Sequence, residues 1–288
     1  MDRTEREASI ARIMAERTGT RPEDWYCVYR ARHGMLSACE AVCATIGEGH
    51  VVTQLLTCCT AVDPILAAGL TPRYGEVSAD TASLDPAVLP LDSSVRAVML
   101  QHTFGLVDDG ASRRIASAAH EAGALVFEDC AHGVARMAKG PDGSPLADVS
   151  FHSFGVEKML HTQFGGAVWV NPEGASPEVL QVLRERLAQL PVTGAHLTAL
   201  TGTFVFWNRV FNHLPLPVAR GLRRFLSGFS TPPFRMRSVV AASRMTPCVR
   251  AMRSAMRSSR RSGAWMRMSW RASRPRGRTR SFLPTSPA

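Results

Sequence analysis

Short apolar runs alternate with helical stretches along the chain up to about residue 190. The apolar runs have strand length, and they are residues 25–29, 51–56, 71–77, 95–101, 124–127 and 167–170. The intervening stretches have helical spacing or end at a glycine, and they are residues 4–17, 35–46, 61–68, 112–121 and 178–190. Residues 80–90 are predicted as a loop.

This alternation predicts an α/β fold, with a central, mostly parallel sheet covered by helices on both faces. In such sheets ligands bind at the carboxyl ends of the strands. Gly34, Cys58, His102 and Asp129 all follow predicted strands. We therefore expect the functional site at this edge.

The pattern changes after residue 193. Residues 194–226 are apolar and aromatic, which would suit packing on the domain, a subunit interface or a membrane surface. Breaks at Pro215, Pro217 and Gly221 favour packing or an interface. From Arg235 onward Arg, Ser, Met and Ala alternate without an apolar face, so no packed domain is expected there.

Charge is distributed unevenly. The net charge is +10, yet residues 235–280 contain 14 arginines and no acidic residue. Residues 1–234 hold the other 20 basic residues and all 24 acidic ones, so the domain itself is acidic. The basic tail raises nucleic-acid binding as an alternative function, although no nucleic-acid motif accompanies it.

Seven cysteines without a regular framework predict reduced thiols and a cytoplasmic protein. The charged N-terminus predicts no signal peptide, and no apolar run reaches the length of a membrane-spanning helix.

Residues 124–170 carry the chemistry. Asp129 follows an apolar strand, Ser153 and Lys158 come downstream, and Gly165-Gly166 precede a second apolar strand. A pyridoxal 5'-phosphate site needs a lysine to form a Schiff base and a carboxylate to keep the pyridinium nitrogen protonated. The chain has only two lysines, and Lys139 lies in a polar turn, so Lys158 is the candidate.

Each residue also has an ordinary structural interpretation. Asp129 alone would be a strand-end cap, Lys158 a surface lysine and His132 a structural histidine. The phosphate of the cofactor needs hydroxyl and N–H donors. Ser153 and the turn at His33-Gly34 are the candidates, although a glycine at a helix start is more often a cap.

The segment resembles the DegT/DnrJ/EryC1/StrS sugar aminotransferase family, which is PLP-dependent and has the aspartate aminotransferase fold (fold type I). The motifs that carry the resemblance are Glu128-Asp129-Cys130-Ala131-His132, Ser153-Phe154-Gly155-Val156-Glu157-Lys158, Gln163-Phe164-Gly165-Gly166-Ala167, His102-Thr103-Phe104-Gly105 and Gly69-Leu70-Thr71-Pro72. The resemblance covers residues 28–170 and extends weakly toward 240.

The resemblance implies a role for each matching residue. Lys158 would form the Schiff base and carry the proton, Asp129 would bind the pyridinium nitrogen, His132 would contact the ring oxygen and Ser153 the phosphate. The reaction implied is amino transfer, usually from glutamate, to a keto-sugar attached to a nucleotide, in a homodimer. A lysine at position 158 separates this chain from the dehydratase branch of the family, which has histidine there.

Two positions depart from the family pattern. Arg32-His33-Gly34-Met35 replaces the family's S-G-T-A phosphate turn, so a hydroxyl is missing while the N–H groups remain. Arg32 would add charge if it points inward. Cys58 stands where the family has an aromatic residue that stacks on the cofactor ring.

The predicted organisation has four parts: a helical segment (1–27), the cofactor-binding large domain (28–193), an apolar helical segment (194–234) and an Arg-rich tail (235–288). By this resemblance, the small domain of the family is expected to be missing or scrambled in this sequence. A frameshift or truncation near residues 235–240 is one hypothesis, and a genuine basic tail is the other. A catalytically inactive, PLP-binding family member is the main alternative function.

Overall fold

The computed structural model describes residues 3–155, 158–160, 164–191, 193 and 195–228. Its first half contains α1 (Arg3–Thr18), η1 (Pro22–Asp24), β1 (Trp25–Val28), α2 (Ala31–Ile46), β2 (His50–Gln54), α3 (Cys59–Ala67), β3 (Thr71–Gly75) and β4 (Val95–Gln101). The elements that follow are η2 (Thr103–Gly105), α4 (Asp109–Glu121), β5 (Leu125–Asp129), β6 (Val149–Ser153), β7 (Gly166–Val170), α5 (Pro177–Ala188), α6 (Ala195–His213) and α7 (Leu216–Gly228).

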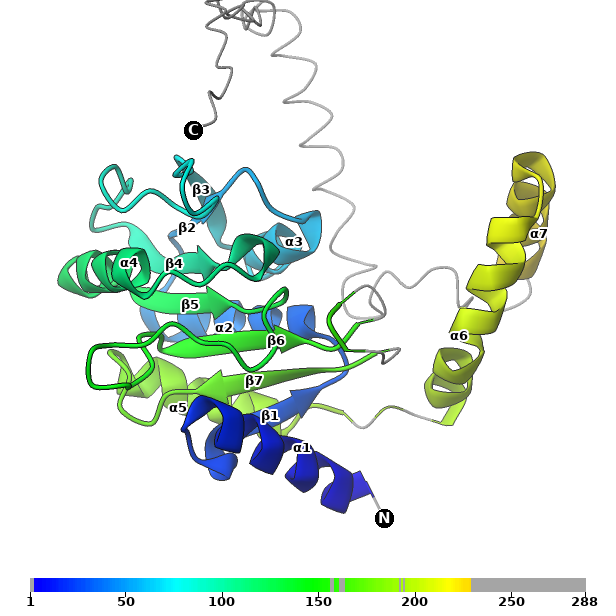
Figure 1. The fold of residues 1–288 in the computed structure, drawn as a ribbon, viewed down its shortest axis with the longest axis horizontal. Coiled ribbons are helices and arrows are strands. Elements are labelled where there is room, and N and C mark those ends of the chain that lie inside the picture. Colours follow the sequence, from blue (N-terminus) through cyan, green and yellow to red (C-terminus); the bar gives the residue numbers. More distant parts are fainter. Residues whose placement is uncertain (1–2, 156–157, 161–163, 192, 194, 229–288) are drawn as a thin grey trace, which may run out of the picture. The chain divides into compact units, whose positions relative to one another are not determined.

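The strands form one seven-stranded sheet in the order β1-β7-β6-β5-β4-β2-β3 (Figure 1). All described pairings are parallel except those of β7, which runs antiparallel to both β1 and β6. The mostly parallel α/β fold predicted from the sequence is therefore confirmed. The carboxyl ends of β4, β5 and β6 meet at one edge of the sheet.

Alternating side chains of the strands fill two separate core layers, as a two-sided sheet requires. One layer joins α2 and α5 to residues such as Phe127, Phe151 and Val168. The other joins α4 to Val126 and Val98. α1 packs on the β1–β7 end, where its Met14 and Ala15 share a cluster with sheet residues (Figure 1).

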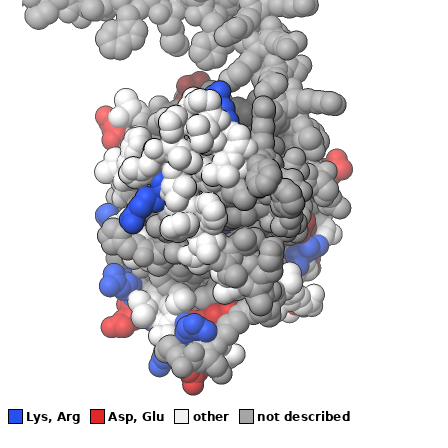
Figure 2. Space-filling model, turned by 90° about the vertical axis from the view of Figure 1, so that its right-hand side faces the viewer, with Lys and Arg blue, Asp and Glu red and all other residues white. Residues whose placement is uncertain are grey.

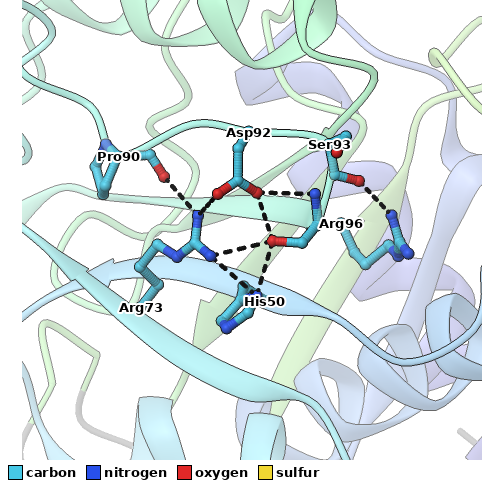
Figure 3. Close-up of polar contacts among 7 residues, drawn as sticks. His50, Arg73, Pro90, Asp92, Ser93 and Arg96 are labelled. Atoms are coloured by element: carbon cyan, nitrogen blue, oxygen red, sulfur yellow. Dashed lines mark hydrogen bonds and ion pairs between the residues drawn. The ribbon is translucent and has the colours of Figure 1, made fainter.

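A polar cluster connects β3, an outer strand of the sheet, to its surroundings near the amino ends of the strands (Figure 3). Arg73 donates to Asp92 Oδ2 at 2.6 Å and to Ser94 Oγ at 3.1 Å, and its Nη2 lies 3.2 Å from His50 Nδ1. Hydrogen bonds from Ser94 and Arg73 lower the pKa of Asp92 to about 2. The cluster ties β2 and β3 to the segment before β4, on the opposite edge from the expected site.

The structure extends or shortens several predicted elements. β4 has its predicted bounds, whereas α2 begins at Ala31, so Gly34 lies in the first turn of the helix and not in a turn before it. β6 was not among the predicted strands. Its sequence contains the polar residues Ser150 and His152, yet both are fully buried, so an alternation of polar and apolar residues here does not mark an exposed face.

Residues 195–228 form α6 and α7, in the segment predicted as apolar and helical. Phe206, Leu216 and Val218 are more than half exposed. Figure 2 shows one face of the molecule, on which the described residues are largely uncharged, with scattered charged groups. No helix in the described part of the chain is long and apolar enough to span a bilayer. The predictions for residues 235–288 lie outside the described residues.

Candidate active site

A cavity of about 360 Å³ opens at the carboxyl edge of the sheet. Its wall is formed by the residues that follow β2, β4, β5 and β6 and by the first turns of α2 and α3. Five of the predicted site residues line it, namely Cys58, Asp129, His132, Ser153 and Lys158. The topology thus brings together groups that lie far apart in the sequence.

Asp129 is the last residue of β5, and its side chain points into this cavity while 7% of the residue remains exposed. The backbone N–H of Ala131 donates to its Oδ1 at 2.9 Å. Burial raises the pKa of this carboxyl group, and the N–H of Ala131, Lys158 and His132 offset that rise only in part. A cationic partner in the cavity would favour the ionised form of this carboxyl group.

Lys158 lies on the loop that follows β6. Its backbone N–H donates to the carbonyl of Gly155 at 2.9 Å, and Lys158 lines the cavity. The ammonium group is near enough to lower the pKa values of Asp129, His132 and Cys58. The predicted lysine and carboxylate therefore face one space.

His132 is held by the turn after β4. Its Nδ1 accepts a hydrogen bond from the N–H of Phe104 at 3.2 Å, and the two rings stack at 6.4 Å. Phe104 has a positive φ of 56°, which is unusual for a side chain of this size. The next residue, Gly105, has no room for a side chain, because a Cβ atom there would lie 2.6 Å from the carbonyl oxygen of His132. Burial and Lys158 lower the pKa of His132.

Ser153 ends β6 beside Gly166 of β7, and the paired glycines have a packing reason. A side chain at Gly166 would lie 2.8 Å from the backbone nitrogen of Ala31 and 2.7 Å from the carbonyl of His152. Gly165 has a φ of 139°, which side chains rarely adopt. The glycines therefore let the start of α2 lie directly against the sheet beside the cavity.

His33 and Gly34 were predicted to supply the phosphate turn, but neither is part of the cavity wall. A methyl group on Gly34 would overlap the γ-methyl of Val168, so this glycine serves the packing of α2 on β7. His33 stacks on Tyr29 at 6.0 Å, and burial together with Arg32 and Arg30 lowers its pKa to about 4. The cavity wall at this end consists of Arg30, Ala31 and Arg32.

Cys58 caps α3 and is exposed in the cavity. Burial raises the pKa of its thiol, but hydrogen bonds from Thr60 and Cys59, together with Lys158, outweigh this and leave the pKa below its ordinary value. Thr60 Oγ1 lies 3.2 Å from the sulfur. A polarised thiol, not an aromatic ring, therefore occupies this wall.

Several lining residues were not predicted from the sequence. They are Arg30, Arg32, Thr57, Gln101, Phe164 and Phe204, of which Arg32 was considered only as a source of charge. Gln101 accepts from Thr57 and its Nε2 donates to Thr103 Oγ1 at 2.9 Å, so β4 supports this wall. The position of Gln101 at a strand end was the available signal. Phe204 comes from α6 and packs edge-on against Phe164 at 5.1 Å.

Behind Asp129, Glu128 is fully buried and binds His102 Nε2 at 2.8 Å. It also accepts from the N–H of Ala138 at 2.6 Å and from Ser150. Burial would raise the pKa of Glu128, but these donors lower it below its ordinary value. With Cys130, this pair brings three potential metal-ligand atoms within 4.8 Å of one another. The carboxylate already has three donors, which favours a structural role.

The sequence profile of the DegT/DnrJ/EryC1/StrS aminotransferase family matches residues 28–187. GDP-perosamine synthase of Vibrio cholerae is 27% identical over 138 residues, which cover 47% of this chain and 37% of that protein. The spore coat polysaccharide biosynthesis protein SpsC of Bacillus subtilis is 28% identical over 137 residues, or 46% of this chain and 35% of that protein.

Among solved structures, the aminotransferase TlmJ from Streptoalloteichus hindustanus superposes with a TM-score of 0.53 at 25% sequence identity. The superposition covers 66% of this chain and 52% of that one. The chain thus matches little more than a third of the length of the two sequence relatives and about half of the structural one.

Proposed function

Because the chain belongs to the DegT/DnrJ/EryC1/StrS aminotransferase family, we propose that it is a PLP-dependent aminotransferase acting on a keto-sugar or a related keto substrate. The observation that carries the proposal is the single cavity lined by both Lys158 and the buried Asp129. An amine that forms a Schiff base and a carboxylate that pairs with the ring nitrogen are the two groups that this cofactor requires.

The residues of the cavity fit pyridoxal phosphate in size and chemistry. A volume of about 360 Å³ is within the range of small-molecule sites. Asp129 offers a carboxyl group, Ser153 a hydroxyl group and Lys158 an amine, while Gly166 leaves room for the helix start beside them. When bound, the cofactor would act as an electron sink for the carbon that gains or loses the amino group.

Each residue has a defined task in this proposal. Lys158 would hold the cofactor and carry the proton of the 1,3-shift between the two carbon atoms on either side of the transferred nitrogen. Asp129 would keep a proton on the ring nitrogen, because an ionised carboxylate beside that nitrogen favours its protonated, charged form. His132 contacts the ring oxygen, and its position is fixed by the N–H of Phe104.

The substrates are inferred from the relatives. The names GDP-perosamine synthase and spore coat polysaccharide biosynthesis protein both concern sugars, so a keto-sugar carried on a nucleotide is the proposed acceptor. Glutamate is the proposed amino donor.

We further propose that the protein acts as a homodimer. Large apolar side chains at the carboxyl edge of the sheet are exposed, among them Leu55 (75%), Phe104 (72%) and Met159 (60%). They follow β2, β4 and β6, the same strands that lead to the cavity. A second copy of the chain is the proposed cover for this surface.

The attachment of the cofactor tests the proposal directly. Purified protein is expected to carry a visible absorbance band, and borohydride reduction should leave the cofactor mass on the peptide that contains Lys158. Lys158→Ala should lose the band and lower amino transfer at least about 100-fold, because a general acid–base group is lost. Lys139→Ala replaces the only other lysine of the chain and should keep both properties.

Adding glutamate to the purified protein tests whether glutamate is the amino donor and whether the protein transfers the amino group. The proposal predicts that glutamate converts the absorbance band and releases one 2-oxoglutarate per bound cofactor. A band that persists with glutamate would identify a PLP-binding protein without turnover. Protein that stays colourless after incubation with the cofactor, or that keeps the band in Lys158→Ala, would refute the assignment.

A further inference from the structure

Two arginine side chains line the same end of the cavity. Arg30 caps α2 and Arg32 is the second residue of that helix, with Ala31 between them. The partial positive charge of the helix N-terminus therefore adds to two guanidinium groups. This end of the cavity is adjacent to Gly166, whose missing side chain admits the helix start.

Arg30 is held in place by aromatic rings. Its guanidinium carbon lies 4.4 Å from the centre of the Phe164 ring and 5.9 Å from the centre of the Tyr29 ring. Such contacts fix the orientation of a guanidinium group without neutralising its charge. The side chain is thus a positioned cation in the cavity wall.

The cavity wall has an excess of positive charge. Arg30, Arg32 and Lys158 are cationic, and Asp129 is the only acidic residue among the described residues of the wall. Burial and the charge of Arg32 lower the pKa of Arg30, and both arginines depress the pKa of His33. The fold therefore brings two like charges together at a cost that an anion bound between them would relieve.

We infer that the side chains of Arg30 and Arg32 form a subsite for a phosphate monoester, which in the proposed function is the phosphate group of the cofactor. Guanidinium groups bind phosphate oxygens in pairs of charge-assisted hydrogen bonds. The arginines thus replace the donors expected from His33 and Gly34, neither of which lines the cavity, and the N–H of His33 donates to the carbonyl of Arg30 at 2.9 Å. This inference rests on the proposed function for the identity of the ligand.

Binding measurements on the full chain test the subsite without reference to activity. Equilibrium dialysis compares pyridoxal phosphate with pyridoxal, which lacks the phosphate group. Arg32→Gln and Arg30→Gln are each expected to weaken pyridoxal phosphate binding roughly ten- to a hundredfold and to change pyridoxal binding less than about twofold. Arg32→Lys should retain part of the affinity, and Arg113→Gln, an exposed site on α4, should match the wild type.

The possible outcomes separate the subsite from the proposed function. Equal losses for both ligands, or no loss for either, would overturn the subsite while pyridoxal phosphate binding by the wild type upholds the function. If the wild type binds neither ligand, the proposed function fails, and calorimetry with inorganic phosphate then decides. Phosphate binding that Arg32→Gln abolishes supports the subsite, and absence of phosphate binding refutes it. Weakened glutamate binding with unchanged phosphate binding would instead assign the arginines to a carboxylate.

Discussion

At the scale of single residues, the buried His152 makes the stability of the folded protein depend on pH. Its ring is fully buried, its Nδ1 accepts from the N–H of Ala135 at 3.2 Å, and its Nε2 has no hydrogen-bond partner among the described residues. Burial lowers the pKa of His152 to about 4, although the nearby Glu128 acts in the opposite direction. The histidine is therefore neutral in the folded protein at pH 5 and protonated in the unfolded chain.

This difference predicts a loss of stability on acidification. The unfolded state binds more protons between pH 6.5 and about 4, so the free energy of unfolding falls as the pH drops through this range. The contribution of His152 is roughly 2 kcal/mol at pH 5 relative to pH 7.5. Urea unfolding at the two pH values should show this decrease in the free energy of unfolding. In His152→Gln the decrease should be smaller by the contribution of His152.

His213→Gln, at an exposed helix end, is the matched control and should leave the pH dependence unchanged. His120 works in the opposite direction, because its hydrogen bond to Asp148 raises its pKa in the folded state. Comparison of the wild type with His152→Gln isolates the buried ring from this offset. An identical pH dependence in the two proteins would disprove the assignment.

Sequence pattern predicted some residues of the site and not others, for a physical reason. Asp129 and Lys158 stand at motif positions whose chemistry is specific, and both line the cavity. Arg30 and Arg32 depend on how α2 starts and on which way its first side chains turn. That direction is set by the close approach of Ala31 to Gly166, which no local pattern encodes.

At the scale of elements, the packing of α2 on β7 depends on one missing side chain. Gly34 faces Val168, and Phe151 is the next neighbour of a side chain placed there. Gly34→Ala is expected to lower the free energy of unfolding by about 1–3 kcal/mol, because the added methyl group overpacks this contact. The midpoint of urea unfolding measures the loss.

Shortening Val168 should make room for that methyl group. Gly34→Ala combined with Val168→Ala is expected to be more stable than the sum of the single changes by about 1 kcal/mol. Gly202→Ala, in open space on α6, is the control and should not destabilise the protein. Strict additivity of the two core changes would show that the helix and the strand are not in steric contact at this point.

The elements predicted best are those with a single consistent period. β4 has its predicted bounds, because its apolar positions, Val95 and residues 97–100, are all buried. β6 escaped prediction because its buried Ser150 and His152 find partners in Glu128 and Ala135, contacts that exist only after folding. The sequence predicts a turn at Gly34 and misses its packing role, because the steric constraint on this residue comes from Val168 of β7, far along the chain.

At the scale of the whole molecule, the exposed apolar side chains at the carboxyl edge predict self-association. Light scattering should give a mass about twice that of the 31.3 kDa chain. Leu55→Asp and Met159→Asp are expected to weaken the dimer roughly tenfold or more, since each would bury a charge at the interface. Val88→Asp, at an apolar and 55% exposed position between β3 and β4, should leave the mass unchanged.

A monomeric wild type, or charged variants that dimerise normally, would show that this surface has another role.

The sequence predicted the α/β architecture because alternation of strands and helices is a property of long stretches, not of single contacts. This reasoning does not extend to residues 235–288, because their sequence has no hydrophobic period and they lie outside the described residues.

The position of β1 has a consequence for synthesis of the chain. Among the described strands β1 lies at the edge of the sheet and pairs only with β7, the last of them in the sequence, with Trp25 opposite Trp169. A nascent chain must therefore hold its first strand unpaired until Gly166–Val170 has left the ribosome. Until then Trp25 and Val28 have no sheet to join, and they present an apolar segment of the kind that chaperones bind. The sheet is complete only when β7, the last described strand in the sequence, pairs with β1.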